Sequence, residues 1–480
     1  MLPVSQKRSI VVPVPKSESS DMADPTNFRP IANVSFLSKI IEKVVAAQLT
    51  HYLNKNYLLP FFQSGFRKDH STETLLLRLL SDIYTAIDNS QVTLLALFDV
   101  SAAFDTVDHD ILLTRLSISF GISENFLNWL TSYLQDRSYT VAWGATRSSW
   151  VPAPFGLPQG SVLGPLLYII YTADLGPLLL ANSILSQSYA DDLQAYVHCP
   201  ASAATDAVRE ICRAMETLEA WMSSNRLRLN PTKTQYIWFG TRQQLAKIDM
   251  KASALEFPLI TFSPFVRDLG VILDQELTFT RHINLLCRSC YYQLRQLKVV
   301  SRSLSFSAAS TLVHSFVVSR LDYCSTLYHG LPADRIGCLE RVLRSAARLV
   351  GHIPKYGHVS SYMRDTLHWL PSPQRIAYRV CALVRRCIEG LAPPYLREFC
   401  CSTLGVQRRS TLRSANHAEL LVPRSRTAIR QRCSFSVAGP TAWNGLPVTL
   451  RLIPRGHSAL FLKNLKSVLF SSGWAGSASE

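Results

Sequence analysis

The sequence predicts an α+β fold in which a small antiparallel sheet is backed by helices. Two short apolar, β-prone stretches, 184–185 and 193–197, lie on either side of Asp191 and Asp192. This pattern is typical of two strands joined at a tight turn. Residues 203–222 carry apolar side chains along one stripe, as amphipathic helices do. The C-terminal part of the chain has a helical and basic pattern, so both kinds of element contribute to the expected core.

Length and composition are those of a globular protein. A chain of 480 residues suits about two to four domains. Its 47% apolar and 18% charged residues disfavour a disordered chain. No uninterrupted apolar run approaches the roughly 20 residues that span a bilayer, and the proline-broken start at Met1 lacks the layout of a signal peptide. We therefore expect a soluble, intracellular protein that does not act on a membrane.

The net charge of +16 is distributed unevenly along the chain. Residues 1–280 carry 22 Lys and Arg against 26 Asp and Glu, whereas residues 281–480 carry 28 against 8. An arginine-rich half beside a half with clustered carboxylates favours a polyanion as the partner. A basic surface that serves only solubility is the alternative.

The eleven cysteines predict neither secretion nor a defined metal site. Cys287 and Cys290 have the spacing of a zinc-ligand pair, but no second pair follows at a suitable distance. Both lie within a helical apolar pattern. We interpret them as thiols of the core.

Two groups of carboxylates carry the main functional signal. Asp191 and Asp192 lie at the predicted hairpin tip, where adjacent like charges cost free energy unless cations or backbone donors compensate them. A solvated turn is the alternative. The apolar run 93–98 predicts a buried strand that ends in Asp99, and Asp105 follows. Carboxylates placed in this way can hold two divalent ions roughly 4 Å apart, and hard oxygen ligands favour Mg²⁺.

Other elements follow from periodicity and capping signals. Ser71 or Thr72 is expected to cap a helix that runs to about Asp88. A last helix is expected to end near Phe470, with residues 471–480 disordered. An earlier amphipathic helix is expected to bury one apolar face, formed by Leu37, Ile40, Ile41, Val44, Val45 and Leu49.

Several short motifs identify a family. The stretches Phe98–Asp105, Gly156–Pro165 and Tyr189–Asp192 resemble successive motifs of reverse transcriptases, in the variant of non-LTR (LINE-type) retrotransposons. Further motifs are matched in the same order by Asn27–Ile31, Gln63–Arg67 and Leu229–Thr234. A weaker resemblance continues through much of the C-terminal half. The resemblance implies a right-hand polymerase with fingers, palm and thumb.

This resemblance implies four segments along the chain. Residues 1–92 would form fingers and a template-contacting segment, and residues 93–260 would form the palm with interleaved fingers elements. Residues 261–350 would form a primer grip and a helical thumb, and residues 351–480 a basic C-terminal region. Relatives of this type usually also carry an endonuclease. No such domain precedes the fingers motifs, so we expect a fragment or truncated copy that lacks the upstream endonuclease.

The implied activity is RNA-directed DNA polymerisation, in which dNTPs extend a primer 3′-hydroxyl with two Mg²⁺ ions, or Mn²⁺ as a substitute. Asp99 and Asp191 would be the main metal ligands, with Asp192 as the third carboxylate and the Val100 carbonyl as a further ligand. Lys233 would protonate the leaving pyrophosphate. A surface lysine is the alternative for that residue.

The resemblance also implies a nucleotide site. Lys16 and Arg29 would clamp the triphosphate. Phe104 would lie under the incoming sugar and exclude a 2′-hydroxyl, whereas Gln159 and Gly160 would line the pocket for the nascent base pair. A solvated lysine is the alternative for Lys16, and an ordinary core phenylalanine is the alternative for Phe104.

Contacts to template and primer are expected in three places. Arg67 would contact a template phosphate, and Leu269 and Gly270 would form the bend of a primer-grip hairpin. The thumb arginines with helical spacing are Arg341, Arg344 and Arg348. An exposed charged face is the alternative for these arginines, and we disfavour it because no acidic partners stand out at helical spacing.

The expected partners are an RNA template, a DNA primer or target and dNTPs, with no protein partner. Target-primed synthesis would take place in the nucleus. One rival function is a non-catalytic nucleic-acid-binding remnant, which the intact carboxylates disfavour. Another is an RNA-templated RNA polymerase, which Phe104 and the Tyr-Ala-Asp-Asp sequence ending at Asp192 disfavour. A group II intron maturase is a third, disfavoured by the C-terminal resemblance.

Overall fold

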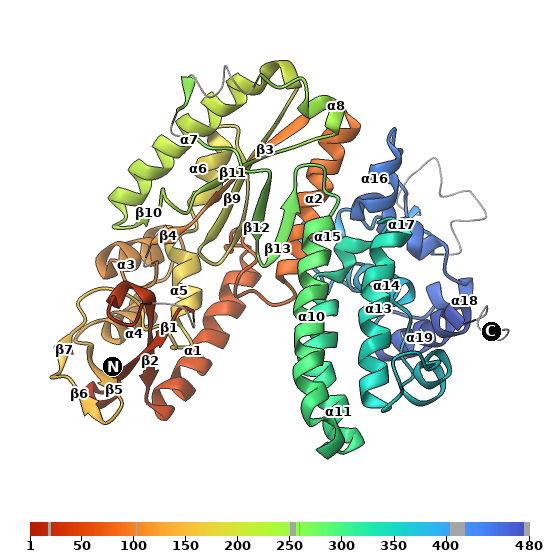
Figure 1. Cartoon of the computed structure of the whole chain (residues 1–480). Coiled ribbons are helices and arrows are strands. Elements are labelled where there is room, and N and C mark those ends of the chain that lie inside the picture. The colour runs from red at the N-terminus through yellow and green to blue at the C-terminus, as the bar shows by residue number, and fades with distance from the viewer. Residues whose placement is uncertain (18–20, 102, 250–255, 259, 404–417, 475–480) are drawn as a thin grey trace. The chain divides into compact units, whose positions relative to one another are not determined.

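The computed structural model describes residues 1–17, 21–101, 103–249, 256–258, 260–403 and 418–474 (Figure 1). Helices and antiparallel strand pairs both occur, which confirms the α+β class. The chain divides into two compact units. Unit 1 comprises Met1–Arg67, Ala96–Val197 and Val208–Gln235; unit 2 comprises Lys68–Leu95, His198–Ala207 and Tyr236–Glu480. The four segments expected from the sequence stay a prediction.

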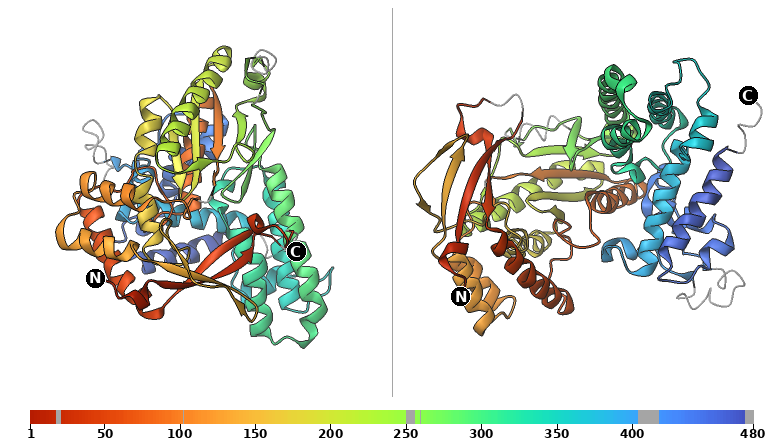
Figure 2. Two further views of the ribbon diagram at one scale, coloured as in Figure 1. Left: turned by 90° about the vertical axis from the view of Figure 1, so that its left-hand side faces the viewer. Right: turned by 90° about the horizontal axis from the view of Figure 1, so that it is seen from below.

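The first sheet of unit 1 is mixed and has the order β2-β1-β5-β6, with β7 also paired to β5. β1 (Arg8–Pro15) runs antiparallel to β2 (Phe28–Val34) and parallel to β5 (Ser138–Trp143). The short strands β6 (Thr146–Arg147) and β7 (Val151–Pro152) are antiparallel to β5. β1 and β2 form a long ribbon (Figure 2), and the loop that joins them begins at Lys16.

The helices of unit 1 include α1, α3, α4, α5 and α6, which are Phe36–Lys55, His109–Ile118, Glu124–Leu134, Gly164–Tyr171 and Leu175–Ala181. The hydroxyl of Ser35 accepts from the Ser38 amide at the start of α1, and the Asp108 carboxylate accepts from the first amides of α3. Both are standard N-caps that satisfy amides without an intrahelical partner. All of α5 apart from Pro165 is buried.

The expected apolar face of α1 is wrong in part. Leu37, Ile40 and Val44 are exposed, whereas Ser38 and Glu42 are buried. The Glu42 carboxylate accepts hydrogen bonds from buried backbone amides just before α5, which turns this polar edge of the helix inward. Burying a carboxylate is tolerated when such donors surround it, so the hydrogen bonds override the apolar pattern.

Four strands form the second sheet, in the order β11-β3-β9-β8. They are β3 (Val92–Phe98), β8 (Leu185–Tyr189), β9 (Asp192–Cys199) and β11 (Gln235–Phe239). β8 and β9 are antiparallel and pair from Leu185 with Tyr196 up to Tyr189 with Asp192. The expected buried strand before Asp99 and the expected hairpin are therefore confirmed.

Helix α7 (Ala204–Ser224) confirms the expected amphipathic stripe, since Val208, Ile211, Leu218 and Met222 are all buried. A short antiparallel pair then joins β10 (Arg228–Leu229) to β4 (Val100–Ser101), directly after the Asp99 position. A polar turn follows β10 and leads into β11.

Unit 2 is mainly helical. Its elements are α2 (Thr72–Asp88), α8 (Arg242–Leu245), β12 (Phe265–Asp268), β13 (Val271–Asp274), α10 (Thr280–Val300), α11 (Phe306–Val313), a π-helix (His314–Val318), α12 (Ser319–Asp322), α13 (Ala333–Val350), α14 (Ser372–Glu389), α15 (Pro394–Arg397), α16 (Ala428–Cys433), α17 (Phe435–Asn444), α18 (Val448–Arg451) and α19 (Ser458–Trp474). Cys290 is fully buried within α10, as expected for a core thiol, and Cys287 is half-buried. Helix α14 packs against α13, α17 and α19, as Figure 2 also shows.

The end of the chain differs from expectation. Helix α19 continues past Phe470 to Trp474, whose side chain is buried, so the expected disorder is wrong for residues 471–474. Burial of a large aromatic ring stabilises the last turn. Residues 475–480, and the arginine-rich stretch 404–417, lie outside the described residues.

The C-terminal region holds helix α2 through several ion pairs. Arg379 contacts Glu73 at 2.9 Å near the start of α2, and Arg430 contacts Asp88 at 2.7 Å at its end. Between them, Arg78 pairs with Glu398 at 2.6 Å. Several arginines of unit 2 therefore form ion pairs with acidic residues of the same unit.

One segment, Gly164–Ala181, is long and apolar enough to cross a membrane by length and composition alone, and 56% of it is buried. It consists of α5 and α6 with a break between them, where Asp174 pairs with Arg115 at 3.2 Å. Buried core helices have the same composition.

Candidate active site

The β8–β9 hairpin presents two carboxylates at its tip. Tyr189 and Asp192 form the last strand pair, and Ala190 and Asp191 make the connection between them. Ala190 has a left-handed backbone with a φ of 58°. Asp191 is half-buried and Asp192 is exposed, so both remain reachable from solvent.

Asp99 directly follows β3, and its backbone carbonyl is hydrogen-bonded to a second segment of unit 1. The Asn230 amide donates to the Asp99 carbonyl at 2.9 Å, and the β10–β4 pair fixes the same connection. The turn that begins at Asn230 carries Lys233, whose Nζ lies 3.2 Å from Asp99 Oδ2. The structure therefore brings Lys233 and Asp99 together, although the amine sits on the carboxylate as an ion pair.

The carboxylates at the hairpin tip and the end of β3 repel one another. Burial is the main cause of a raised pKa at Asp191, and the negative charge of Asp99 raises it further, against the opposing charges of Arg29 and Lys233. Partial loss of hydration and the charges of Asp191 and Asp99 raise the pKa of Asp192 to about 6. Because the Asp192 side chain remains exposed, we regard the neighbouring charges as the firmer cause. The site therefore holds more negative charge than its cations neutralise.

These residues fit Mg²⁺ by their donor chemistry. Among the described residues, no three His, Cys, Asp or Glu side chains are arranged as a ready metal cage. Mg²⁺ does not need one, because it is usually held by one or two carboxylates together with substrate phosphates. Asp99, Asp191 and Asp192 are hard oxygen donors, and the Val100 backbone lies next to the first of them.

Lys16 and Arg29 lie at neighbouring positions of the β1–β2 ribbon. Arg29 is exposed on β2 opposite Val14, and Lys16 directly follows β1. Lys16 Nζ donates to the Thr26 carbonyl at 2.8 Å. The charge of Arg29 acts on Asp191 and that of Lys16 acts on Asp105. Both cations therefore belong to the electrostatic surroundings of the carboxylates.

Phe104 is half-buried and held by two other rings. It stacks on Tyr168, with ring centroids 4.8 Å apart, and meets Phe66 edge-on at 6.3 Å. Its carbonyl accepts from the Leu157 amide at 2.7 Å. Phe104 is therefore braced by neighbouring rings and remains partly accessible. Phe66, which is 54% exposed, was not singled out from the sequence.

Gln159 and Gly160 are held in a tightly fixed loop. Gln159 Nε2 donates to both carboxylate oxygens of Asp105 at 3.1 Å, and the Gln159 carbonyl accepts from the Ala32 amide at 2.7 Å. Gly160 has a φ of 120°, and a Cβ there would lie 2.6 Å from the Ala32 carbonyl. Only glycine fits this position. Asp105 thus orients the Gln159 amide, a role that the sequence did not reveal.

Asp105 and Gln159 also line a cavity of about 410 Å³ beside the first sheet. Burial raises the pKa of the Asp105 carboxyl, although the Gln159 hydrogen bond and the charge of Lys16 oppose this rise. Arg137, which is 4% exposed, also lines this cavity.

Glu42 also stabilises the loop that contains Gln159 and Gly160. The sequence did not predict this role. The Glu42 carboxylate is 1% exposed and accepts from the amides of Val162 and Leu163 at 2.7 and 3.1 Å, and from the Ser38 hydroxyl at 3.0 Å. The available signal was that Glu42 is the single acidic residue of a helix rich in apolar side chains.

Arg67 does not extend into solvent. Its guanidinium donates to the Pro60 carbonyl and to the Gln63 carbonyl, the latter at 3.1 Å. The residue braces its own loop within unit 1. The predicted contact with a template phosphate stays a prediction.

The remaining predicted residues belong to unit 2. Leu269 and Gly270 form the two-residue turn between β12 and β13, with φ values of 44° and 85°. Positive φ at both positions is the geometry of a tight hairpin turn. The Tyr323 hydroxyl donates to the Leu269 carbonyl at 2.6 Å. The expected strand–bend–strand arrangement is confirmed, and contact with a primer stays a prediction.

The thumb arginines differ from expectation in their surroundings. All three lie on α13, but Arg344 pairs with Glu340 at 3.1 Å, so the expected lack of acidic partners is wrong. Arg348 donates to the Gly357 carbonyl at 3.2 Å, and Arg341 to the Cys338 sulfur at 3.0 Å. Glu340 is one turn before Arg344, the spacing at which helical ion pairs form.

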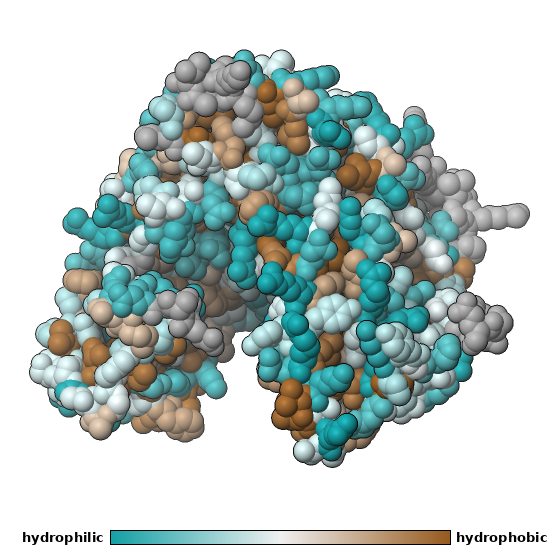
Figure 3. Space-filling view, viewed as in Figure 1, coloured by the Kyte–Doolittle hydropathy of each residue, from teal (hydrophilic) through white to brown (hydrophobic). Residues whose placement is uncertain are grey.

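Helix α10 has a basic stripe that the sequence reading missed. Alternating steps of three and four residues place on one face of α10, and leave exposed, Arg281, Asn284, Arg288, Tyr291, Arg295 and Lys298, and Arg302 continues the row just beyond the end of the helix. No ion pair among the described residues involves these side chains. The stripe extends for about 30 Å at the helical rise, and the surface over α10 is largely hydrophilic (Figure 3). Its regular spacing was the available signal.

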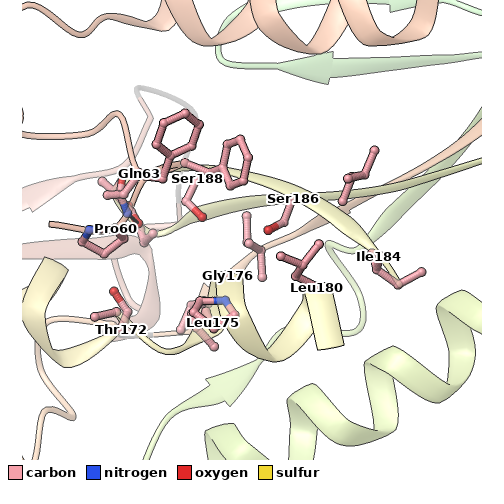
Figure 4. Close-up of a pocket in the computed structure, with 18 of the residues that line it drawn as sticks. Pro60, Gln63, Thr172, Leu175, Gly176, Leu180, Ile184, Ser186 and Ser188 are labelled. Atoms are coloured by element: carbon pink, nitrogen blue, oxygen red, sulfur yellow. Dashed lines mark hydrogen bonds between the residues drawn. The ribbon is translucent and has the colours of Figure 1, made fainter. Parts of the chain in front are cut away.

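A cavity of about 250 Å³ adjoins the hairpin in unit 1. Pro60 and Gln63 line it from one side, α5 and α6 from another, and Ser186 and Ser188 of β8 from a third (Figure 4). Its lining is mostly apolar. The loop around Gln63 and the β8–β9 hairpin therefore line the same cavity.

Comparisons with known proteins show which family model and which relatives the chain matches. The model of the family described as "Reverse transcriptase (RNA-dependent DNA polymerase)" matches residues 14–262. The chain is 33% identical over 285 residues to the "Probable RNA-directed DNA polymerase from transposon BS" of Drosophila melanogaster, which covers 57% of this chain and 30% of that protein. It is 28% identical over 287 residues to the "RNA-directed DNA polymerase from mobile element jockey" of the same organism, covering 58% of this chain and 30% of that protein.

The matched region thus spans about a third of the length of these curated relatives. Among solved structures, telomerase from Candida tropicalis in complex with a fragment of telomeric RNA has a TM-score of 0.44 at 10% identity, covering 96% of this chain and 64% of that chain.

Proposed function

Because the chain belongs to the reverse transcriptase (RNA-dependent DNA polymerase) family, we propose that it extends a primer 3′-hydroxyl with dNTPs on an RNA template, as part of a non-LTR retrotransposon. The observation that carries this proposal is the group formed by Asp99, Asp191 and Asp192, in which burial and the neighbouring negative charges raise the pKa values of Asp191 and Asp192. Such a cluster is expected where a metal-bound triphosphate is to be received.

Members of this family generally use divalent metal ions. We assign two Mg²⁺ ions, or Mn²⁺ in their place, to Asp99 and Asp191, with Asp192 and the Val100 carbonyl as further donors. When bound, the ions would lower the pKa of the primer hydroxyl and neutralise the triphosphate and pyrophosphate. Lys233 is within 3.2 Å of Asp99, so release from this ion pair would free its amine to donate a proton to pyrophosphate.

The residues around the carboxylates would select and orient the nucleotide. Arg29 and Lys16 supply the cations for the triphosphate. Phe104 supplies a rigid ring against a 2′-hydroxyl, since Tyr168 prevents the ring from moving aside. The side-chain nitrogen Nε2 of Gln159 donates to Asp105, which leaves its side-chain oxygen Oε1 for the nucleotide.

We assign the template–primer duplex to the basic stripe of α10, with Arg341 as an additional contact. The stripe is an exposed row of mainly basic side chains that also includes Tyr291. Its positive charge is complementary to the negative charge of a phosphate backbone. Arg344 and Arg348 are less suited because they already bind Glu340 and the Gly357 carbonyl.

The test is primer extension on poly(rA)/oligo(dT) with Mg²⁺, comparing dTTP with UTP and wild type with Asp191→Asn/Asp192→Asn. Extension with dTTP alone that is lost in the double variant is the expected result. Extension with UTP would move the function to an RNA polymerase and remove the role of Phe104. Salt-sensitive RNA binding without any extension would leave a non-catalytic remnant as the better account.

A further inference from the structure

The segment before α2 runs beside the catalytic hairpin in unit 1. The Ser64 amide donates to the Ser188 carbonyl at 2.8 Å, and the Ser188 amide donates to the Phe62 carbonyl at 2.9 Å. Gln63 and Ser188 thereby form a parallel bridge. Figure 4 shows Gln63 next to Ser188, at the wall of the cavity. The hairpin that carries the carboxylates is therefore supported along β8 by a separate part of the chain.

The Gln63 side chain extends this support to the hairpin tip. Its Oε1 accepts from the amides of Ala190 and Gly65 at 2.9 and 2.8 Å, and its Nε2 donates to the Ala190 carbonyl at 3.1 Å. A carboxamide has a donor and an acceptor side by side, so one Gln side chain satisfies both backbone groups of Ala190. Only one orientation of the amide makes both bonds. Gln63 is 5% exposed, so water does not compete for them.

Ala190 needs such support because of its backbone conformation. Its φ of 58° lies in the left-handed region, where a Cβ is unfavourable and glycine is preferred. This residue directly precedes Asp191, so its conformation sets the direction in which the carboxylate leaves the hairpin. A second observation shows how close the fit is: a Cβ on Gly65 would lie 2.2 Å from the Ala190 nitrogen.

We propose that Gln63 is a positioning residue for Asp191 and Asp192, which holds Ala190 in its left-handed conformation through paired side-chain hydrogen bonds. The inference rests on the proposed polymerase function for its kinetic consequence, but the contact itself does not. Without the clamp, the tip would relax towards right-handed backbone and the two carboxylates would lose their alignment. Displacements of about 1 Å at reacting groups cost roughly 100-fold in rate.

The kinetic test combines Gln63→Ala with Ala190→Gly. Gln63→Ala should lower kcat for primer extension by about 10- to 100-fold with KM for dNTP little changed, because nucleotide contacts are intact. Ala190→Gly should recover at least about fivefold of that loss, since glycine tolerates a left-handed φ without the clamp. Gln48→Ala, on the exposed face of α1, is the matched control and should behave as wild type. A kcat unaffected by Gln63→Ala, or no recovery with Ala190→Gly, would overturn the proposal.

A second measurement separates this proposal from the proposed function. Hydrogen exchange at the Ala190 amide should be faster in Gln63→Ala than in wild type, because the amide loses its acceptor, and unchanged in the control Gln48→Ala. If wild type does not extend primers but Gln63→Ala speeds this exchange, the polymerase function fails while the clamp stands. Unchanged exchange in Gln63→Ala would refute the clamp, whatever the activity.

Discussion

Asp88, at the end of α2, and Asp191, at the hairpin tip, are carboxylates with opposite surroundings. Burial raises the pKa of the Asp88 carboxyl, but hydrogen bonds from Arg430, Thr427 and Arg426 outweigh it and lower the pKa to about 2. At Asp191, burial and a neighbouring carboxylate raise the pKa instead. The same side chain is thus fully compensated in one place and left without sufficient counter-charge in the other.

This difference separates a structural carboxylate from a functional one. Asp88 makes its full set of bonds within the chain and joins α2 to residues 425–430. At the hairpin tip, the charges of Arg29 and Lys233 do not offset burial and the neighbouring carboxylate, so a bound cation would stabilise Asp191. Uncompensated charge in a native structure costs free energy, so its retention indicates a role in binding.

The largest expected effect is at the hairpin. Asp191→Asn should lower the rate of primer extension by more than about 100-fold. Loss of even a residue that only orients a metal ligand costs up to roughly 100-fold. The free energy of unfolding of Asp191→Asn should be equal to or above that of wild type, because one member of a repelling group is neutralised. Parallel extension assays and chemical denaturation measure both quantities. A variant that is inactive because it is unfolded would contradict the comparison.

Asp88→Asn should do the reverse. Loss of the charge leaves the Arg430 guanidinium without its partner and should lower the free energy of unfolding by about 3 kcal/mol, while the extension rate per folded molecule stays close to wild type. Urea denaturation and active-site titration provide the two readings. Adding Arg430→Met should recover part of the stability, since it removes the unpaired cation. Equal stability of Asp88→Asn and wild type would show that the contact is not structural.

The Asp88 contact should also appear in the pH dependence of stability. The folded pKa of about 2 is below the usual value, so the unfolded chain binds the proton more readily. The stabilisation is therefore complete above about pH 5 and is lost as the pH falls through 4 towards 2, by an amount of about 1 to 2 kcal/mol. The difference in unfolding free energy between wild type and Asp88→Asn should shrink over this range. A constant difference would contradict the assignment.

The basic residues allow the smallest and most graded test. Arg288→Ala on α10 should reduce the slope of log affinity for a template–primer duplex against log salt by about one unit, because an unpaired arginine that contacts a phosphate releases a counterion. Arg344→Ala is the matched control, since its guanidinium already binds Glu340. Fluorescence anisotropy at several salt concentrations gives both slopes. Equal reductions of the slope in Arg288→Ala and Arg344→Ala would show that α10 and α13 do not differ in their contribution to duplex binding.

Local patterns were sufficient to predict the elements that carry the carboxylates. The apolar run before Asp99 is a buried strand, and Asp191 lies at a hairpin tip, because both depend on short-range periodicity and turn chemistry. The Ser71 cap of α2 is likewise local, since its hydroxyl accepts from the Thr74 amide.

Contacts between distant segments were not predictable in this way. Glu42 lies more than a hundred residues from the Val162 amide that it accepts from, and Gln63 is equally far from Ala190. Nothing in the sequence near Glu42 indicates these donors, so the apolar pattern of α1 gave the wrong buried face. For Arg344 the acidic partner was local, at the preceding turn, and was overlooked.

The most direct test of the central claim is thermal unfolding with increasing Mg²⁺, at constant ionic strength and without nucleic acid. Wild type is compared with Asp191→Asn/Asp192→Asn. If the hairpin carboxylates bind a cation, Mg²⁺ should raise the Tm of wild type and leave the Tm of the double variant unchanged. Without Mg²⁺, the double variant should be at least as stable as wild type. A wild-type Tm that does not respond to Mg²⁺, together with a less stable variant, would show that these carboxylates are compensated within the chain, as Asp88 is.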